Sequence, residues 1–225
     1  MENKVVLITG AKGGLGTSVT NAFLRAGARV VGVSRSIHDS DFPHPSFTAM
    51  SADLTTPAAA TGLAAEVAAR FQRIDALVHV MGGFAGGARV EETDDATLDQ
   101  MLTLNYRAAF YIVRAVLPHM RRQRSGRILA VASRQAVEPA ANVGAYSASK
   151  AALVALVRTV ALENRDCAIS ANTVLPATMD TPGNTAQDRS PLVPPADVAA
   201  LLLHLASDAG SQITGAAIPV YGRQL

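Results

Sequence analysis

Residues 5–16 read Val5-Val6-Leu7-Ile8-Thr9-Gly10-Ala11-Lys12-Gly13-Gly14-Leu15-Gly16, a short apolar run that leads directly into a glycine-rich turn. The apolar run Val5–Thr9 has the length and the β-branched content of a buried strand. From Gly14 to Arg25 the pattern is that of a helix, which Gly27 stops. A strand, a tight turn and a helix in this order are the first half of a βαβ unit. The stretch therefore predicts a parallel sheet with helices packed against it.

The same alternation continues to the end of the sequence. Further strands are expected at Ala28–Val33, Phe47–Ser51, Asp75–Val80, Arg127–Val131, Ile169–Leu175 and Ala216–Val220. Further helices are expected from Pro57 to about Phe71, from about Asp94 to Arg122 in one or two pieces with the end bent by Pro118, and at Ala145–Asn164 and Ala196–Ala206. We therefore expect a single Rossmann-type, doubly wound α/β domain, residues 1–225, in which about seven parallel strands carry helices on both faces.

The composition limits the possible function classes. A chain of 225 residues, 49% hydrophobic and 17% charged, suits one large globular domain, and its net charge of +2 without a basic run argues against a nucleic-acid binder. Five histidines are scattered without metal-ligand spacing, so no metal site is expected. The single cysteine, Cys167, fits a reducing compartment. The first apolar run is too short for a signal peptide, and no apolar stretch approaches the ~18 residues of a membrane span, so we expect a cytoplasmic protein without a membrane partner.

Three glycines give the first turn a possible ligand. Gly10, Gly14 and Gly16 follow the spacing G-x3-G-x-G at the first strand–helix junction. Glycines there allow a tight turn and a close approach of the backbone to a pyrophosphate, and the N-terminus of the following helix offers free N–H groups to the anion. A tight turn without a ligand is the alternative, but the position at the first junction favours nucleotide binding.

A second motif supplies chemistry. Tyr146 and Lys150 are four residues apart, so on a helix they share one face, and Ser133 lies thirteen residues upstream of the tyrosine. A phenol with a pKa of ~10 is a usable acid at neutral pH, and a nearby ammonium stabilises the phenolate and lowers that pKa. A serine hydroxyl can bind the oxygen of a carbonyl or an alcohol. The set predicts proton transfer during C–OH/C=O interconversion, although a surface Tyr and a solvated Lys can share this spacing by chance.

Taken together, these motifs resemble the short-chain dehydrogenase/reductase family over nearly the whole chain. The resemblance rests on Thr9–Gly16, Asp53-Leu54, Asp75–Val78 with Gly82-Gly83, Leu104-Asn105-Tyr106, the set Ser133, Tyr146 and Lys150, and Leu175-Pro176-Ala177-Thr178. It implies that Asp53 reaches the adenine amino group and that the loop after Leu175 covers the nicotinamide amide. It also implies that Asn105 anchors a water linking Lys150 to solvent and completes the catalytic set.

The resemblance also implies which residues would contact each ligand. The cofactor would contact Thr9, Gly10, Lys12, Gly13, Gly14, Leu15, Gly16, Ser34, Arg35, Asp53, Leu54, Met81, Gly82, Gly83, Tyr146, Lys150, Pro176, Ala177, Thr178 and Thr181. The substrate would contact Phe84, Ser133, Gln135, Tyr146 and Met179. The implied activity is an NAD(P)(H)-dependent carbonyl reductase or alcohol dehydrogenase acting on a small carbonyl or alcohol. Tyr146 would transfer the proton, Ser133 would polarise the substrate oxygen, and Lys150 would lower the tyrosine pKa and hold the nicotinamide ribose.

The sequence departs from the family pattern at three places. His79-Val80-Met81-Gly82 stands where the family usually has Asn-Asn-Ala-Gly, and we interpret His79 as a satisfied structural histidine. Ala177 replaces the usual glycine of Pro-Gly. The segment Met179–Pro195, normally a substrate lid, is short, which predicts a fairly open site.

A narrower resemblance supplies the alternative substrate class. Residues 82–87 and 175–182 look like the corresponding loops of dihydropteridine reductases, which generally lack the catalytic serine and carry an acidic residue after the second strand. This chain has Ser133, and Ser34-Arg35 stand after its second strand. A dihydropteridine or quinone-type reductase is therefore the runner-up. The contrasting class is a non-catalytic dinucleotide-binding sensor or scaffold, which would not need Ser133, Tyr146 or Lys150.

Cofactor choice and assembly complete the expectations. Arg35 can pair with a 2′-phosphate that a carboxylate would repel, and Lys12 can add a second positive charge, so NADP(H) is favoured and NAD(H) remains possible. A homo-oligomer, tetramer ahead of dimer, is expected from a second apolar face on the helices around 98–116 and 145–164. The candidates for that face are Ala109, Ile112, Val113, Leu153, Leu156 and Val160.

Overall fold

The computed structural model describes residues 1–184 and 189–224. Two parts of the chain lie outside the described residues, namely residues 185–188, which belong to the predicted lid segment, and Leu225.

The strands form one parallel sheet with the order β3-β2-β1-β4-β5-β6-β7. Its strands are β1 (Val5–Thr9), β2 (Arg29–Ser34), β3 (Phe47–Ser51), β4 (Ala76–His79), β5 (Gly126–Val131), β6 (Ile169–Pro176) and β7 (Ala217–Val220). The prediction of seven parallel strands is confirmed.

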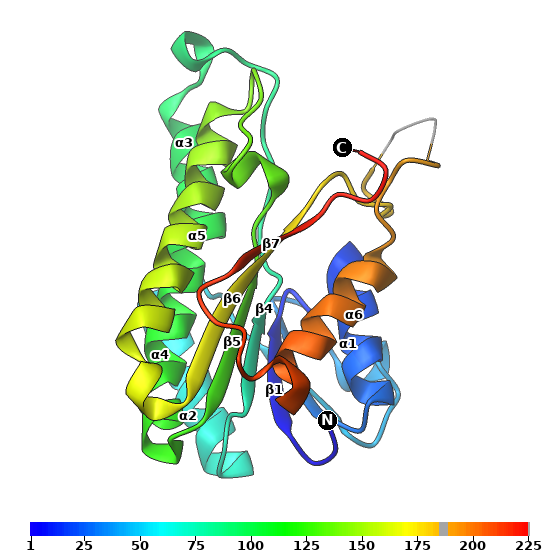
Figure 1. Ribbon diagram of the computed structural model, residues 1–225, viewed down its shortest axis with the longest axis vertical. Coiled ribbons are helices and arrows are strands. Elements are labelled where there is room, and N and C mark those ends of the chain that lie inside the picture. The colour runs from blue at the N-terminus through cyan, green and yellow to red at the C-terminus, as the bar shows by residue number, and fades with distance from the viewer. Residues whose placement is uncertain (185–188, 225) are drawn as a thin grey trace.

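Helices cover both faces of this sheet, as a doubly wound fold requires (Figure 1). They are α1 (Gly14–Arg25), α2 (Pro57–Phe71), α3 (Asp95–Leu102), α4 (Ala108–Gln123), α5 (Gly144–Glu163) and α6 (Pro195–Ala206). Helices α2, α4 and α5 lie on one side of the sheet, and α1 and α6 lie together on the other (Figure 1). The alternation along the chain thus becomes two helical layers around a buried sheet.

Local sequence signals explain several element boundaries. Thr56 caps α2 by accepting a hydrogen bond from the backbone N–H of Ala59 at 3.4 Å, and Pro57 occupies the first helical position, where its missing N–H costs nothing. Asp94 caps α3 in the same way through Thr97 N–H at 2.7 Å. The long helical region predicted from about Asp94 to Arg122 is in two pieces, α3 and α4, joined by a π-helical turn at Thr103–Arg107, and α4 continues past Pro118.

The connection between β2 and β3 contains a short 3₁₀ turn at Asp39–Asp41 in place of a crossover α-helix. Ile37, Phe42 and Phe47 are buried there, and the two phenylalanine rings lie 4.8 Å apart. Gly32 makes room for this packing, because a Cβ at that position would lie 2.6 Å from the Phe47 ring. Two aromatic rings and an isoleucine therefore cover the part of the sheet that a helix would otherwise cover.

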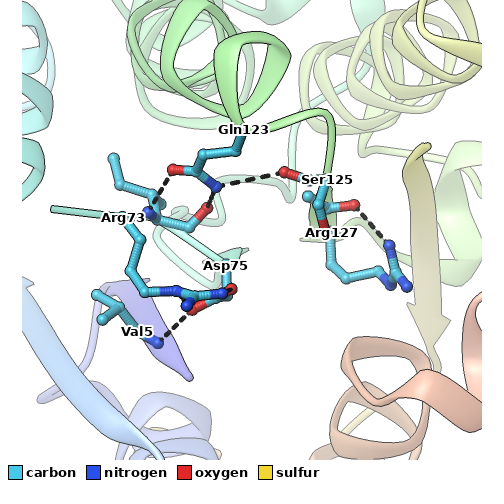
Figure 2. Close-up of polar contacts among 8 residues, drawn as sticks. Val5, Arg73, Asp75, Gln123, Ser125 and Arg127 are labelled. Carbon is cyan, nitrogen blue, oxygen red and sulfur yellow. Dashed lines mark hydrogen bonds and ion pairs between the residues drawn. The ribbon is translucent and has the colours of Figure 1, made fainter. Parts of the chain in front are cut away.

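A polar network holds the amino-terminal ends of the central strands together (Figure 2). The carboxylate of Asp75 accepts a hydrogen bond from Val5 N–H at 2.8 Å and is paired with Arg73, whose Nε lies 2.7 Å from Oδ2. Gln123 of α4 accepts from Ile74 N–H at 2.9 Å and donates to Ile74 C=O at 3.0 Å. This network fixes β1, β4 and α4 at the end of the sheet remote from the loops that carry the predicted site.

Helix α5 meets the length and composition criteria of a membrane span, with 20 residues and a window of mean hydropathy 1.3. The expectation that no stretch approaches this length was therefore wrong. Leu153, Val157 and Val160 of this helix are buried against the sheet, and a core helix of a globular protein passes the same test.

The predicted second apolar face also needs correction. Five of its six residues, Ala109, Ile112, Val113, Leu153 and Val160, are buried within the single chain, and Leu156 is half-buried. Helical periodicity identified apolar positions but did not show that the sheet and the neighbouring helix cover them all. The outward side of α5 instead presents small side chains and one leucine, at Ala148, Ala151, Ala155, Thr159 and Leu162.

Candidate active site

The glycine turn between β1 and α1 has the shape expected of an anion-binding turn. Gly10 has a φ of +69°, and a Cβ at Gly16 would lie 1.9 Å from the Gly10 carbonyl oxygen, so neither position accepts a larger residue without a shift of the backbone. Gly13 precedes α1 without a side-chain cap. The first N–H groups of α1 therefore face the loop without a side-chain partner, as a nucleotide phosphate requires.

A cavity of about 270 Å³ adjoins this turn at the carboxyl ends of β1, β2 and β4. Its lining brings together seven of the predicted cofactor residues, namely Gly10, Ser34, Arg35, Asp53, Leu54, Met81 and Gly82. Hydrogen bonds from Thr55 keep the pKa of the Asp53 carboxyl below its usual value, with Arg35 nearby as a further cause. A larger depression, about 460 Å³, lies between α1 and α6, and none of its lining residues belongs to the predicted site.

The two predicted cofactor cations have different surroundings. Lys12 Nζ lies 2.8 Å from Oδ1 of Asp41 and 3.3 Å from the Ser36 carbonyl oxygen. Arg35 is exposed at the mouth of the cavity. No sequence pattern indicates the pairing of Asp41 with Lys12, because it depends on how the connection Ser36–Ser46 folds.

Ser133 and Tyr146 come together at the end of β5. Ser133 is 5% exposed, and its hydroxyl donates to Gln135 Oε1 at 2.5 Å. It also lies close enough to the Tyr146 phenol to tend to lower the pKa of that phenol. Burial acts in the opposite direction and dominates, so the pKa of Tyr146 is raised above its usual value. The predicted substrate residue Gln135 is thus already a partner of Ser133.

Lys150 is buried below the tyrosine. Its Nζ donates to the Val131 carbonyl oxygen at 3.0 Å and lies 6.0 Å from the centre of the Tyr146 ring. Burial lowers the pKa of Lys150 to about 8. Burial is the larger cause that acts on the pKa of Tyr146 and Ser133 opposes it, so the lowering of that pKa by Lys150 stays a prediction. Helical spacing places the two residues on one face but does not reveal how far burial outweighs their attraction.

Asn105 lies in the π-helical turn and is fully buried. Its side-chain amide accepts from Gly83 N–H at 2.9 Å and donates to Gly83 C=O at 3.0 Å, so it holds both polar groups of one loop residue. It also donates to Ser149 Oγ at 3.0 Å, and Ser149 in turn donates to the Tyr146 carbonyl oxygen at 2.7 Å. Ser149 was not among the predicted site residues. Its position three residues after Tyr146 on the same helix does indicate that the two residues lie close together.

His79 is fully buried at the end of β4. Its Nδ1 is hydrogen-bonded to Thr9 Oγ1 at 2.8 Å, and its Nε2 has no hydrogen-bond partner within residues 1–184 and 189–224. Burial first, and then the charge of Lys150, lower the pKa of His79 to about 3. His79 is therefore a neutral imidazole that joins β1 to β4, and the interpretation of a satisfied structural histidine holds for only one of its two ring nitrogens.

The loop after β6 borders the glycine turn. A Cβ on Gly14 would lie 2.9 Å from Cβ of Thr181, so these two predicted cofactor residues face each other. Met179 forms a bridge with Val193, and Thr178 is held by hydrogen bonds to its backbone. Ala177 is buried and Pro176 is the last residue of β6.

Phe84 forms one wall of the candidate substrate region. It is 67% exposed, and its ring meets the Tyr146 ring edge-on with centroids 5.0 Å apart. An exposed aromatic ring beside the Tyr146 phenol offers a flat apolar surface. Among the described residues, no three His, Cys, Asp or Glu side chains form a cluster that could hold a metal ion.

Comparison with known proteins gives the family. The chain matches the family described as short chain dehydrogenase over residues 4–191. It is 30% identical to the short-chain dehydrogenase/reductase cdmF of Talaromyces verruculosus, over 98% of this chain and 96% of that protein. It is 33% identical to the 2,3-dihydro-2,3-dihydroxybenzoate dehydrogenase of Escherichia coli, over 79% of this chain and 70% of that protein.

A solved structure agrees with these sequence matches. The crystal structure of the 3-ketoacyl-(acyl-carrier-protein) reductase from Brucella melitensis complexed with NADH superimposes on this chain with a TM-score of 0.91. The two proteins are 28% identical, and the match covers 100% of this chain and 99% of that chain. The sheet order, the glycine turn and these matches agree, and the chain belongs to the short-chain dehydrogenase/reductase family of oxidoreductases.

Proposed function

We propose that this protein is an NAD(P)(H)-dependent oxidoreductase that interconverts a small carbonyl compound and its alcohol. The observation that carries the proposal is the convergence of Ser133, Tyr146 and Lys150 at the end of β5, with the Ser133 hydroxyl near enough to the phenol to act on its pKa and Lys150 Nζ 6.0 Å from the centre of its ring. These groups lie on the sheet edge that also carries the nucleotide-sized cavity. A site for proton transfer beside a dinucleotide site is what such a reaction needs.

The residues present fit a dinucleotide. The glycine turn leaves free N–H groups for a pyrophosphate, and the cavity beside it has the size and the polar lining of an adenosine site. Gly82 lies next to Lys150, since an ideal Cβ there would lie 3.0 Å from Nζ, so the lysine is close to the part of the cavity that Gly82 lines. We propose that Thr178 and Thr181 contact the nicotinamide half of the bound cofactor. When bound, the nicotinamide supplies or accepts the hydride.

The protein side chains then manage the proton. With its pKa raised by burial, Tyr146 is protonated at neutral pH and donates its proton to the developing alkoxide during reduction, or receives it during oxidation. Ser133 binds the substrate oxygen and orients it toward the phenol. Lys150, whose pKa is about 8, carries its positive charge at neutral pH and stabilises the phenolate that forms. Asn105 fixes the loop at Gly83 and, through Ser149, the helix turn that carries Tyr146.

A second candidate function is a reductase of pteridine-like or quinone-like rings. The observation that favours it is Phe84, whose exposed ring stands 5.0 Å from the Tyr146 ring and can stack on a flat substrate. Ser133 favours the carbonyl or alcohol reaction over this second candidate. A hydroxyl beside the phenol can bind the oxygen of an alcohol as well as that of a carbonyl.

NADP(H) is the cofactor we favour, with NAD(H) as the alternative. The end of β2 contributes Ser34, Arg35 and Ser36 to the cavity and no acidic side chain, and the exposed Arg35 is placed to pair with a 2′-phosphate. Asp41 argues against NADP(H), because its carboxylate is paired with Lys12 and neutralises that positive charge.

We further propose one catalytic domain over residues 1–225 and a cytoplasmic location. We also propose a homo-oligomer, tetramer ahead of dimer, formed through the outward side of α5.

A panel of substrates tests the proposal against a non-catalytic sensor. Ketones, aldehydes, quinones and a quinonoid dihydropterin are each offered with NADPH and with NADH, and cofactor oxidation is followed at 340 nm on the nicotinamide band. Turnover of a ketone or aldehyde supports the carbonyl reductase, and turnover confined to the ring compounds supports the second candidate. If the protein binds a dinucleotide tightly but turns over no substrate of any class, the oxidoreductase proposal is rejected in favour of the non-catalytic sensor.

A further inference from the structure

The segment after β7 returns to the candidate active site and makes contacts that the proposed mechanism does not use. Gly222, with a φ of +59°, allows a turn in which Gln224 N–H donates to the Tyr221 carbonyl oxygen at 3.0 Å. This turn directs the half-buried Gln224 side chain toward the loop that follows β6. The sequence separation of 46 residues between Gln224 and Thr178 makes this contact invisible to periodicity or motif analysis.

The Gln224 amide holds one loop residue at two points. Its Nε2 donates to the Thr178 carbonyl oxygen at 2.7 Å, and its Oε1 accepts from the Thr178 N–H at 3.2 Å. The same Nε2 donates to the Pro191 carbonyl oxygen at 3.0 Å. Two-point pairing of an amide with a backbone fixes the orientation of a peptide as well as its position. Asn105 holds Gly83 by the same arrangement on the other side of the candidate site.

The backbone of Gln224 is tied to the segment that carries the candidate serine. Arg134, the residue after Ser133, donates from its guanidinium to the Gln224 carbonyl oxygen. The same guanidinium lies 5.0 Å from the centre of the Tyr221 ring and is paired with Glu138 at 2.7 Å. Gln224 thus connects the loop at Thr178 with the segment next to Ser133, two parts of the site that come from different strands.

We propose that Gln224 is a positioning residue that holds the loop Thr178–Thr181 in the place where it borders the nicotinamide half of the cofactor. Thr181 of this loop faces Gly14 of the glycine turn, with 2.9 Å between the threonine Cβ and an ideal Cβ on the glycine, so a displaced loop would open the path between them. Gln224 makes no contact with the adenosine-sized cavity. Its effect should therefore fall on the nicotinamide half of the cofactor alone. This inference rests on the proposed function.

The test compares two ligands in each of three variants by isothermal titration calorimetry. The ligands are whichever of NADPH and NADH the wild type binds more tightly, and the matching adenine nucleotide, 2′,5′-ADP or ADP, which lacks the nicotinamide. Gln224→Ala removes all the amide contacts, and Gln224→Glu keeps the acceptor for Thr178 N–H but places a carboxylate oxygen against the two carbonyl oxygens that Nε2 contacts. Arg223→Ala changes the exposed neighbour and serves as the control.

Each neutral hydrogen bond contributes modestly, so losing three should raise the dissociation constant of the nicotinamide nucleotide about tenfold. Gln224→Glu should raise this dissociation constant at least as much, because a carboxylate oxygen repels the two carbonyl oxygens, and Arg223→Ala should leave it unchanged. In every variant the adenine nucleotide should bind as in the wild type. Equal losses for the two ligands, or no loss for either, would overturn the positioning role. A wild type that binds adenine nucleotides but no nicotinamide nucleotide would instead refute the proposed function.

Discussion

Lys12 Nζ lies 2.8 Å from Oδ1 of Asp41, so the lysine of the glycine turn already has a carboxylate partner before any phosphate arrives. Asp41 belongs to the irregular connection between β2 and β3, and its Oδ2 accepts from His38 N–H at 2.9 Å, which holds the carboxylate in place. Its hydrogen bond with Lys12 is the main cause that lowers the pKa of Asp41. Of the two predicted cations, we therefore expect Arg35 to contribute more than Lys12 to any preference for a 2′-phosphate.

The first prediction concerns cofactor choice. Arg35→Ala should reduce the ratio of kcat/KM for NADPH over NADH about tenfold or more, since one cation close to a phosphate is worth roughly 1–4 kcal/mol. Asp41→Asn should raise that ratio, because it releases Lys12 and removes a carboxylate from the phosphate region. Asp39→Asn is the control, since Asp39 accepts from Ala49 N–H at 2.7 Å and has no ion pair with Lys12. An Arg35→Ala variant with an unchanged ratio would refute the assignment.

The second prediction concerns the proton. Tyr146→Phe should retain cofactor binding but lose ~10²–10⁴-fold in kcat with a ketone substrate, because it removes the general acid. Tyr111→Phe, a half-buried tyrosine on α4, is the matched control and should keep its activity. Retention of more than a tenth of the wild-type kcat by Tyr146→Phe would show that another group donates the proton.

The third prediction concerns acid stability. Burial lowers the pKa of His79 to about 3 in the folded chain, from an ordinary value of 6.5. Between these two values the unfolded chain binds a proton that the folded chain does not, so the free energy of unfolding falls as the pH falls. The slope should approach ~1.4 kcal/mol per pH unit. Urea unfolding between pH 7 and pH 4 measures this slope.

His79→Asn should flatten the slope, because asparagine does not titrate and can still accept from Thr9 Oγ1. His204→Asn, a change at an exposed histidine of α6, is the control and should leave the slope as it is. Equal slopes in the wild type and in His79→Asn would mean that other groups cause the acid sensitivity.

Much of the fold could be predicted because the strands are short apolar runs bounded by breakers. β1, β3, α1 and α2 have the bounds that their sequence signals predict, from the apolar run at Val5 to the Thr56 cap and Pro57. The candidate set Ser133, Tyr146 and Lys150 is also brought together as its spacing suggested. Local patterns succeed where the deciding interactions lie within one element or one turn.

Other features depend on contacts between distant segments. The burial that raises the Tyr146 pKa and lowers the Lys150 pKa comes from the whole fold around α5, so helical spacing could not reveal it. The pairing of Asp41 with Lys12 and of Gln224 with Thr178 spans loops whose course has no periodic signal. Periodicity also failed for the second apolar face, since it cannot distinguish a residue that faces the sheet from one that faces a neighbouring helix.

The fourth prediction concerns the substrate. Phe84→Leu keeps an apolar wall but removes the ring that meets the Tyr146 ring edge-on at 5.0 Å. Aromatic contacts are worth ~0.5–1.5 kcal/mol beyond area, so KM for a quinone or dihydropterin should rise a few-fold to about tenfold. KM for a small aliphatic ketone should stay within twofold of the wild type. A similar rise for both substrates would indicate a general wall without preference for flat rings.

The fifth prediction concerns assembly. Light scattering should give a multiple of the 23.3 kDa chain mass, and Ala155→Glu, on the outward side of α5, should shift it toward a single chain, because a buried unpaired charge is costly. Ala65→Glu, at an exposed position of α2, is the control. A wild type of 23.3 kDa at micromolar concentration would refute the homo-oligomer, and an unaffected Ala155→Glu would move the interface elsewhere.

The π-helical turn at Thr103–Arg107 makes the length of this helical region as important as its composition. Such a turn amounts to one extra residue within an otherwise regular helix. Deleting one residue there would restore an unbroken α-helix with little rotation of α3 relative to α4, because a π-helical turn holds one residue more than an α-helical turn for about the same rotation. Met101 would stay on its buried face, whereas Asn105, which lies inside the turn, would shift relative to Gly83. A one-residue deletion in this segment should therefore leave the core packed and break the contacts between Asn105 and Gly83.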